Sequence, residues 1–106
     1  MAKGDKVLSQ LGIAARANHI ASGEFQTEHA VKAGDAYLVL VAEDASENTK
    51  KNVRNMCGFY QVPMEIYGTR EQLGHCIGKE FRAMLAVTDQ GLADSVQKKL
   101  AEKTTE

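Results

Sequence analysis

The chain has 106 residues, of which 43% are hydrophobic and 25% are charged, the composition of an ordinary folded domain. Its 13 Lys and Arg residues nearly balance 14 Asp and Glu residues, so the net charge of −1 at pH 7 argues against a broad electrostatic footprint for nucleic acid. No apolar run approaches the roughly 18 residues that a membrane span needs. These properties exclude a disordered, collagen-like or membrane-spanning chain, and they predict one domain over 1–100 with a polar, frayed tail over 101–106.

A helix with apolar residues on one side is predicted over 5–16, because those residues recur at helical spacing. The apolar segment 20–22 is too short for more than a minor strand. A second helix is predicted over 23–33, and it ends at Gly34, a residue suited to a left-handed cap. The continuous apolar run 37–42 then predicts a strand buried on both faces, as in a sheet covered by helices.

The second half of the chain continues the alternation of helices and strands. A helix capped by its first residue, a serine, is predicted over 46–60, followed by a short strand over 63–67. A capping box of the S/T-x-x-E/Q form opens a helix over 69–77. A second buried strand over 83–87 and a final helix over 89–100 complete the pattern, which predicts an α/β fold, a single-domain three-layer α-β-α sandwich.

The cysteines and the amino terminus indicate where the protein works. Cys57 and Cys76 lie far apart and form no CxxC pair, so neither a zinc cage nor a redox motif is available. Residues 1–6 are followed by no hydrophobic segment of the secretory type. We therefore expect a reduced, cytoplasmic setting, no metal and no cofactor, with both cysteines as small core residues.

The sequence offers little support for catalysis. It contains no metalloprotease, nucleophile-elbow, dinucleotide or P-loop string. Glu43 and Asp44 follow a predicted strand, where α/β enzymes often keep catalytic groups, and the alternative is that they favour the positive end of the following helix. Cys76 beside His75 is a poor nucleophile–base pair because adjacent helical residues point about 100° apart. An enzyme built on Glu43, Asp44 and the three histidines is therefore an alternative without motif support.

The predicted helix 23–33 is more informative. Its core stripe is expected to consist of Thr27, Ala30 and Val31. The opposite side carries an aromatic ring, an amide at its edge, an imidazole and a cation: Phe25, Gln26, His29 and Lys32. RNA readers use this mixture, and the glycine at the start leaves free N–H groups open to a phosphate. A patch for a partner protein, or Phe25 tucked under the amino-terminal helix, would explain the same pattern.

A second candidate is the turn 78–82, which places two cations and an aromatic ring between a helix end and a buried strand. Taken alone it also fits a solvated connector. Both candidate segments are predicted at helix ends that flank the sheet. We expect them to meet in space as one exposed surface.

The order of several segments resembles the ribosomal L-seven-Ae/L-thirty-e family of kink-turn RNA-binding proteins. The matching segments are 22–34, 38–46, 62–63 and 73–79, and the stretches AEDASENTKK and LGHCIGK look most like the bacterial YlxQ branch. The resemblance spans about residues 6–100. It implies an α-β-α sandwich with a small mixed four-stranded sheet, no catalytic activity, and recognition of a sharply bent RNA with tandem sheared G·A pairs.

The resemblance also implies which residues contact RNA. The family's glycine at the start of the recognition helix is matched by Gly23, and the two readout positions, commonly Asn and Glu, are Phe25 and Gln26 here. The usual lysine one turn later is His29, and a cation before the LG motif is matched by Arg70. The expected RNA-binding residues are Gly23, Glu24, Phe25, Gln26, His29, Lys32, Arg70, Gly78, Lys79, Glu80, Phe81 and Arg82.

The sequence thus predicts a non-catalytic protein that binds structured, kink-turn-like RNA, with ribosomal RNA among the candidates. The alternative is a protein-interaction module of the ribosome or of the transcription and translation machinery, docking through the Phe25 and Phe81 surface. No membrane and no metal partner is expected. Because the chain is slightly acidic, we expect few ionic contacts and a shallow dependence of affinity on salt.

Overall fold

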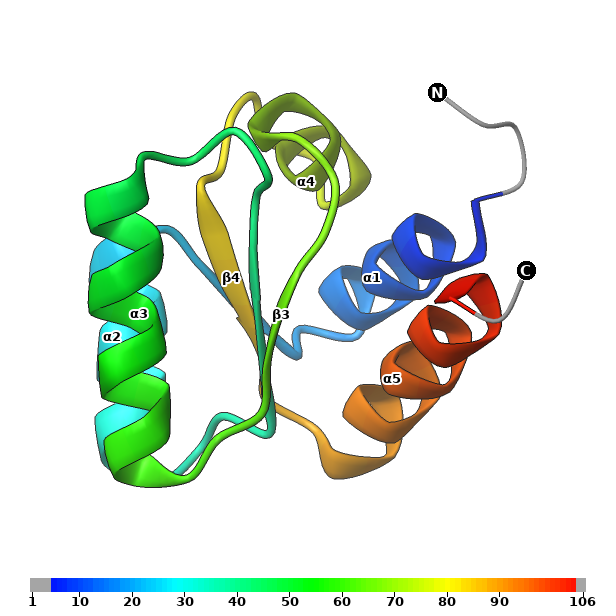
Figure 1. Cartoon of the computed structure of the whole chain (residues 1–106). Coiled ribbons are helices and arrows are strands. Elements are labelled where there is room, and N and C mark those ends of the chain that lie inside the picture. The colour runs from blue at the N-terminus through cyan, green and yellow to red at the C-terminus, as the bar shows by residue number, and fades with distance from the viewer. Residues whose placement is uncertain (1–4, 105–106) are drawn as a thin grey trace.

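The computed structural model describes residues 5–104 (Figure 1). Residues 1–4, part of the stretch expected to carry no secretory signal, and 105–106, the end of the expected tail, lie outside the described residues. In chain order the elements are α1 (Lys6–Arg16), β1 (Ile20–Ser22), α2 (Glu24–Ala33), β2 (Leu38–Val41), α3 (Glu47–Tyr60), β3 (Met64–Ile66), α4 (Arg70–Cys76), β4 (Met84–Val87) and α5 (Gln90–Thr104).

The strands form one sheet in the order β1-β4-β2-β3. β4 is antiparallel to both β1 and β2, and β2 is parallel to β3, so the sheet is mixed as expected. Every residue of the central strands β2 and β4 is buried, which explains their uninterrupted apolar sequences. The edge strands β1 and β3 have three residues each and are only partly buried.

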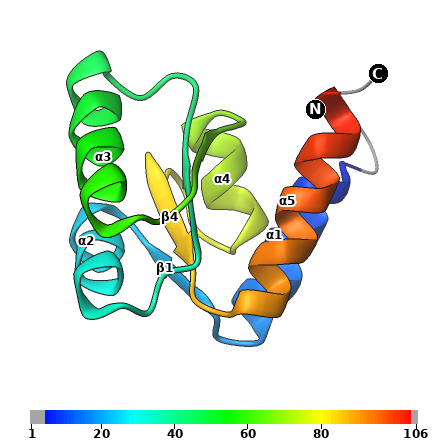
Figure 2. The same ribbon diagram turned by 60° about the horizontal axis from the view of Figure 1, so that its bottom comes forward.

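Helices cover both faces of the sheet. α2 and α3 pack on one face, and α1, α4 and α5 pack on the other (Figures 1 and 2). The buried cluster between the layers includes Leu11, Leu38, Leu40, Leu73 and Leu85. The predicted three-layer α-β-α sandwich is therefore confirmed.

Local signals place the helix ends where the sequence predicted them. The Ser46 hydroxyl accepts a hydrogen bond from the Thr49 N–H at 3.1 Å, at the start of α3. Thr69 and Gln72 form both hydrogen bonds of the capping box that opens α4. Gly34 ends α2 in the left-handed conformation, with φ 81°.

The end of the chain differs from the sequence prediction. α5 continues to Thr104, so residues 101–104 are helical rather than frayed. The reason is helix propensity: Ala101, Glu102 and Lys103 are good helix formers, and a polar sequence does not by itself end a helix. No helix within residues 5–104 is long and apolar enough to cross a membrane.

Gly74 allows the turn 78–82 to fold back onto α4. A Cβ at this position would lie 2.6 Å from the Glu80 carbonyl carbon and 2.8 Å from the Phe81 nitrogen, both backbone atoms that cannot swing aside. We therefore expect Gly74→Ala to lower the free energy of unfolding by about 1–3 kcal/mol, measured by urea denaturation. The matched control is Gly58→Ala in α3.

A Cβ at Gly58 would meet nothing within 4 Å. Gly58→Ala should therefore raise the free energy of unfolding by about 0.5–1 kcal/mol, because alanine suits a helix interior better than glycine. Equal effects of the two substitutions would contradict the close approach at Gly74.

Candidate nucleic-acid interface

The start of α2 and the turn before β4 lie at the same end of the neighbouring strands β1 and β4. The antiparallel register of β1 and β4 pairs Ser22 with Leu85, so β1 ends where β4 begins. The Gly23 N–H donates a hydrogen bond to the Met84 carbonyl at 3.0 Å. This backbone hydrogen bond holds Gly23, the residue before α2, at the start of β4, which follows the turn 78–82.

Gly23 is the N-cap of α2 and supplies no capping side chain. Its φ of 87° and ψ of 168° belong to a region that essentially only glycine occupies. The first helical hydrogen bond runs from the Thr27 N–H to the Gly23 carbonyl at 3.0 Å. Within residues 5–104, the N–H groups of 24–26 therefore point out of the helix end without a protein acceptor, while the N–H of Gly23 itself is already used.

Phe25 is displayed on the surface, with 76% of it exposed. Its ring stacks on the imidazole of His29, with the ring centroids 6.4 Å apart and the planes 14° from parallel. The alternative that Phe25 packs under α1 is therefore wrong. The predicted core stripe is correct, because Thr27, Ala30 and Val31 are buried.

Arg82 joins the two candidate segments. Its Nε donates to the Ser22 hydroxyl at 3.2 Å, just before α2. Its Nη1 donates to the carbonyl of Phe81 at 2.7 Å, and Phe81 itself is 60% exposed. The guanidinium therefore holds the turn 78–82 against the end of β1.

Gln26 and Lys79 line one surface hollow of about 340 Å³. The other lining residues are Ala15, Asn18, Ile20, Ala21, Ser22 and Ile77. The two candidate segments thus meet in space, as expected. We call the surface formed by the half-buried Gly23 and Arg82 and the exposed Phe25, Gln26, His29 and residues 78–81 the platform.

Arg70 lies beside the platform and is fixed by Asp44. The Asp44 Oδ1 accepts the Arg70 backbone N–H at 2.8 Å, and the Asp44 Oδ2 lies 3.5 Å from the Arg70 Nε. The Arg70 carbonyl accepts the Arg82 N–H at 3.0 Å, which ties α4 to the turn. The Asp44 carboxylate therefore stabilises the positive N-terminal end of α4. The expectation that it would stabilise the start of α3, the next helix in the chain, is wrong. The reason is that the fold brings the start of α4 beside the end of β2, next to Asp44.

The Asp44 carboxylate should make the stability of the protein depend on pH. The hydrogen bond from the Arg70 backbone, and then the Arg70 charge, hold the pKa of Asp44 below its ordinary value of 3.8. A depressed folded-state pKa adds stability that is present above 3.8 and is lost as the pH falls through the lower folded value. Asp44→Asn should therefore melt at a lower temperature at pH 7, and the difference should shrink towards about pH 2.

Thermal denaturation between about pH 2 and pH 7 measures this effect. Glu43→Gln is the matched control, because Glu43 is an exposed acid whose side chain makes no hydrogen bond within the described part of the chain. It should change the melting temperature at pH 7 less than Asp44→Asn does. A difference for Asp44→Asn that stays constant over the whole pH range would contradict the assigned contact.

Lys32 does not join the platform. Its Nζ lies 2.7 Å from the Glu28 Oε2, and this contact raises the pKa of Lys32. Glu24, Glu28 and Lys32 line a different groove, between α2 and α3. An i,i+4 Glu–Lys pair was visible in the sequence and is the signal that would have placed Lys32 there.

The cysteine thiols are poor candidates for catalysis. Burial raises the pKa of both Cys57 and Cys76 to about 11, so both thiols stay protonated near neutral pH. Cys57 is in the core, as predicted, while Cys76 is partly buried and its Sγ donates to the Leu73 carbonyl at 3.2 Å. His75 is exposed. In residues 5–104 no three His, Cys, Asp or Glu side chains lie close enough together to hold a metal ion.

The three-layer sandwich of five helices and a four-stranded mixed sheet is the fold of a known protein family. The sequence model of the ribosomal protein L7Ae/L30e/S12e/Gadd45 family matches residues 5–97, and the chain belongs to this family. Within it, the chain is 45% identical over 86 residues to the RNA-binding protein YlxQ of Bacillus subtilis, covering 81% of this chain and 86% of that protein. The YlxQ protein of Enterococcus faecium is 35% identical over 83% of this chain and 84% of its own length. The expected bacterial branch is confirmed.

A ribosomal protein and two solved structures are also similar to this chain. The large ribosomal subunit protein eL8 of Haloquadratum walsbyi is 31% identical over 86% of this chain and 78% of its own. A solved structure of a Bacillus halodurans protein of unknown function superposes with a TM-score of 0.87 at 40% identity, covering 91% of this chain and 97% of that one. The Giardia lamblia 15.5kD RNA binding protein superposes with a TM-score of 0.76 at 18% identity, over 96% and 89% of the two chains, which shows the fold alone.

Proposed function

We propose that this protein is a non-catalytic RNA-binding protein that holds a sharply bent, kink-turn-like RNA in the cytoplasm. The observation that carries the proposal is the platform, where uncapped helix amides, an exposed aromatic pair and a cation-bearing turn meet at one edge of the sheet. The names of the YlxQ and eL8 relatives support an RNA partner.

Each part of the platform suits a different part of an RNA. The N–H groups at the start of α2, with the positive end of the helix behind them, suit a phosphate. Phe25 and Phe81 offer exposed rings on which unstacked bases can stack. The hollow lined by Gln26 and Lys79 brings an amide to a base edge beside a cation. Arg70, Lys79 and Arg82 supply positive charge for the backbone.

The proposed mechanism is selection of a shape. Bending RNA sharply brings phosphates together, so the bent form is a minor state of the free molecule. A protein that fits only the bent form shifts the population towards it by its difference in affinity for the two shapes. This proposal is supported by the contacts that hold the two segments of the platform together, the Gly23–Met84 backbone hydrogen bond and the Arg82–Ser22 hydrogen bond.

A binding titration with two labelled RNAs tests this function. One is a kink-turn RNA and the other is a straight duplex of the same base composition. We expect a clear preference for the kink-turn RNA. With three cations at or beside the platform, the logarithm of the affinity should fall with the logarithm of salt concentration with a slope of roughly −2 to −3.

Equal affinity for the two RNAs would contradict the proposal that the protein recognises the bent shape of the RNA. A salt slope of about −6 or steeper would show that nonspecific charge dominates. Binding to neither RNA, together with retention of a ribosomal or transcription protein after RNase treatment, would favour the alternative of a protein-interaction module that docks through Phe25 and Phe81.

A further inference from the structure

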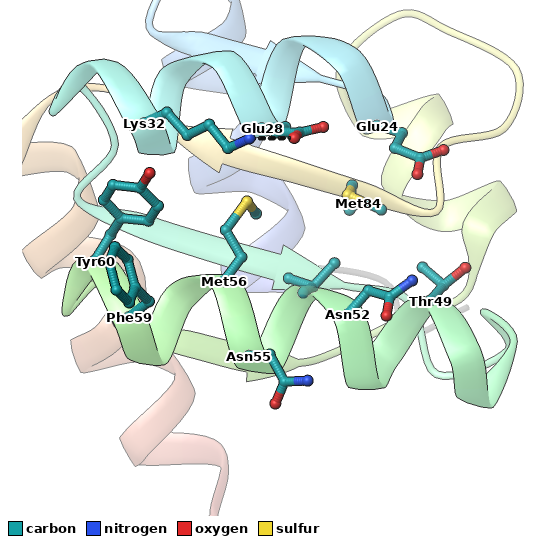
Figure 3. A pocket seen from close by; sticks show the side chains of 11 residues that line it. Glu24, Glu28, Lys32, Thr49, Asn52, Asn55, Met56, Phe59, Tyr60 and Met84 are labelled. Atoms are coloured by element: carbon teal, nitrogen blue, oxygen red, sulfur yellow. Dashed lines mark hydrogen bonds and ion pairs between the residues drawn. The ribbon is translucent and has the colours of Figure 1, made fainter.

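A groove of about 460 Å³ runs between α2 and α3, on the side of α2 that carries Glu24, Glu28 and Lys32 (Figure 3). The α3 wall consists of Thr49, Asn52, Val53, Asn55, Met56, Phe59 and Tyr60. Met84 from β4 lies at the bottom between the helices (Figure 3). The groove shares the α2 helix with the platform but none of the platform's residues.

One end of the groove is aromatic and apolar. Phe59 is 79% exposed, and its ring meets the ring of Tyr60 edge to face with the centroids 4.9 Å apart. The Met56 side chain reaches from α3 into the groove beside them (Figure 3). Exposed aromatic rings and a flexible methionine side by side are typical of surfaces that bury another apolar side chain.

The other end of the groove is acidic and polar. Glu24 lies there, near Thr49 and Asn52 (Figure 3). Its carboxylate has no hydrogen-bond or ion-pair partner within the described residues, whereas Glu28 is paired with Lys32 at 2.7 Å. The charged side chains of the groove therefore leave one uncompensated negative charge, which repels phosphate and attracts a cation.

We infer that this groove receives a basic amphipathic helix of a partner protein. A helix laid between two helices presents apolar residues at i, i+3, i+4 and i+7, which suits the Met56, Phe59 and Met84 surface. A Lys or Arg side chain at one end of its apolar stripe faces Glu24. The ten residues of α2 extend over about 15 Å, so two to three turns of a partner helix fill the groove.

The partner is a second ligand, bound beside the platform rather than in place of RNA. RNA fits the groove poorly because Glu24 and Glu28 line it, while Lys32, the cation among its lining residues, is already paired with Glu28. The inference does not depend on the proposed RNA function, since it uses a different side of α2.

The test uses the full chain labelled with ¹⁵N and a defined probe, a 14-residue helical peptide of leucine and lysine with one apolar stripe. A peptide of the same composition in scrambled order lacks the stripe, and a leucine–glutamate peptide reverses the charge. We expect the first peptide to shift the side-chain amide signals of Asn52 and Asn55 and to leave that of Gln26 in place. The scrambled and acidic peptides should bind at least about tenfold more weakly.

Two exposed phenylalanines give a matched pair of variants. Phe59→Ser should weaken peptide binding about tenfold or more and leave RNA binding unchanged, since truncation of a buried aromatic anchor commonly costs at least this much. Phe81→Ser should leave peptide binding unchanged and weaken RNA binding. Glu24→Gln should weaken peptide binding about threefold at low salt. Circular dichroism checks that each variant is folded.

Several results would overturn the inference. The scrambled peptide could bind as tightly as the first peptide, or the acidic peptide could bind more tightly. Oligouridylate, rather than the peptide, could shift the side-chain amide signals of Asn52 and Asn55. Finally, Phe59→Ser could leave peptide binding unchanged. Concentration-dependent dimerisation by sedimentation that Phe59→Ser abolishes would assign the groove to a second copy of this chain. RNA binding by Phe81→Ser tests the proposed RNA function, and peptide binding by Phe59→Ser tests the groove. Each proposal can therefore fail without affecting the other.

Discussion

Replacing Phe25 with alanine is expected to weaken binding of a kink-turn RNA by about 5- to 150-fold, because stacking of a base on an aromatic ring contributes about 1–3 kcal/mol. The ring is 76% exposed and contacts the His29 ring, so its removal should leave the free energy of unfolding nearly unchanged. Fluorescence anisotropy with the labelled RNA measures the affinity, and urea denaturation measures the stability.

Phe59→Ala is the matched control for this experiment. Phe59 is 79% exposed, on α3, and lies outside the platform. The proposed function requires that it leave RNA affinity unchanged. If both alanine variants bound RNA equally well, Phe25 would have no stacking role, and a large loss of stability in Phe25→Ala would mean that the ring supports the fold.

Gly23→Ala should damage both stability and binding. Its backbone angles, φ 87° and ψ 168°, cost a non-glycine residue about 1–3 kcal/mol. Relief of that strain moves the first turn of α2 and the amides of 24–26 with it. We expect RNA affinity to fall roughly tenfold or more, since a hydrogen bond to a charged group contributes about 1.5–3 kcal/mol.

Gly34→Ala separates the two effects, because Gly34 ends the same helix with φ 81° and a Cβ there would meet nothing within 4 Å. It should lower the free energy of unfolding by about 1–2 kcal/mol, as expected for a left-handed residue, and leave RNA affinity unchanged when measured well below the melting temperature. Equal losses of affinity in the two variants would show that helix stability, and not the amides beside Gly23, determines binding.

The features that the sequence predicted are those encoded by neighbouring residues. The Thr69 capping box and the left-handed Gly34 act within one helix turn, and both appear in the structure. The buried strands β2 and β4 were visible as apolar runs because both of their faces are covered. The exposure of Phe25 followed from the position of the core stripe on the same helix.

The features that were missed depend on residues far apart in the chain. Asp44 binds Arg70, 26 residues later, because the sheet brings the end of β2 beside the start of α4. The groove needs α2 and α3 side by side, and nothing in either helix alone reveals that Phe59 stays uncovered. The pairing of Lys32 with Glu28 is the exception, since its i,i+4 spacing was available in the sequence.

The order β1-β4-β2-β3 has one more consequence, for behaviour at high concentration. The fully buried strands β2 and β4, of four residues each, lie inside the sheet. The edge strands β1 and β3 have three residues each and therefore few unpaired backbone groups to offer another molecule. Pro63 precedes one of these edge strands and the charged Glu65 is exposed in its middle, both features that discourage the addition of a foreign strand. The sheet is thus protected against edge-to-edge aggregation, and a crowded solution should contain no β-linked polymers of this protein.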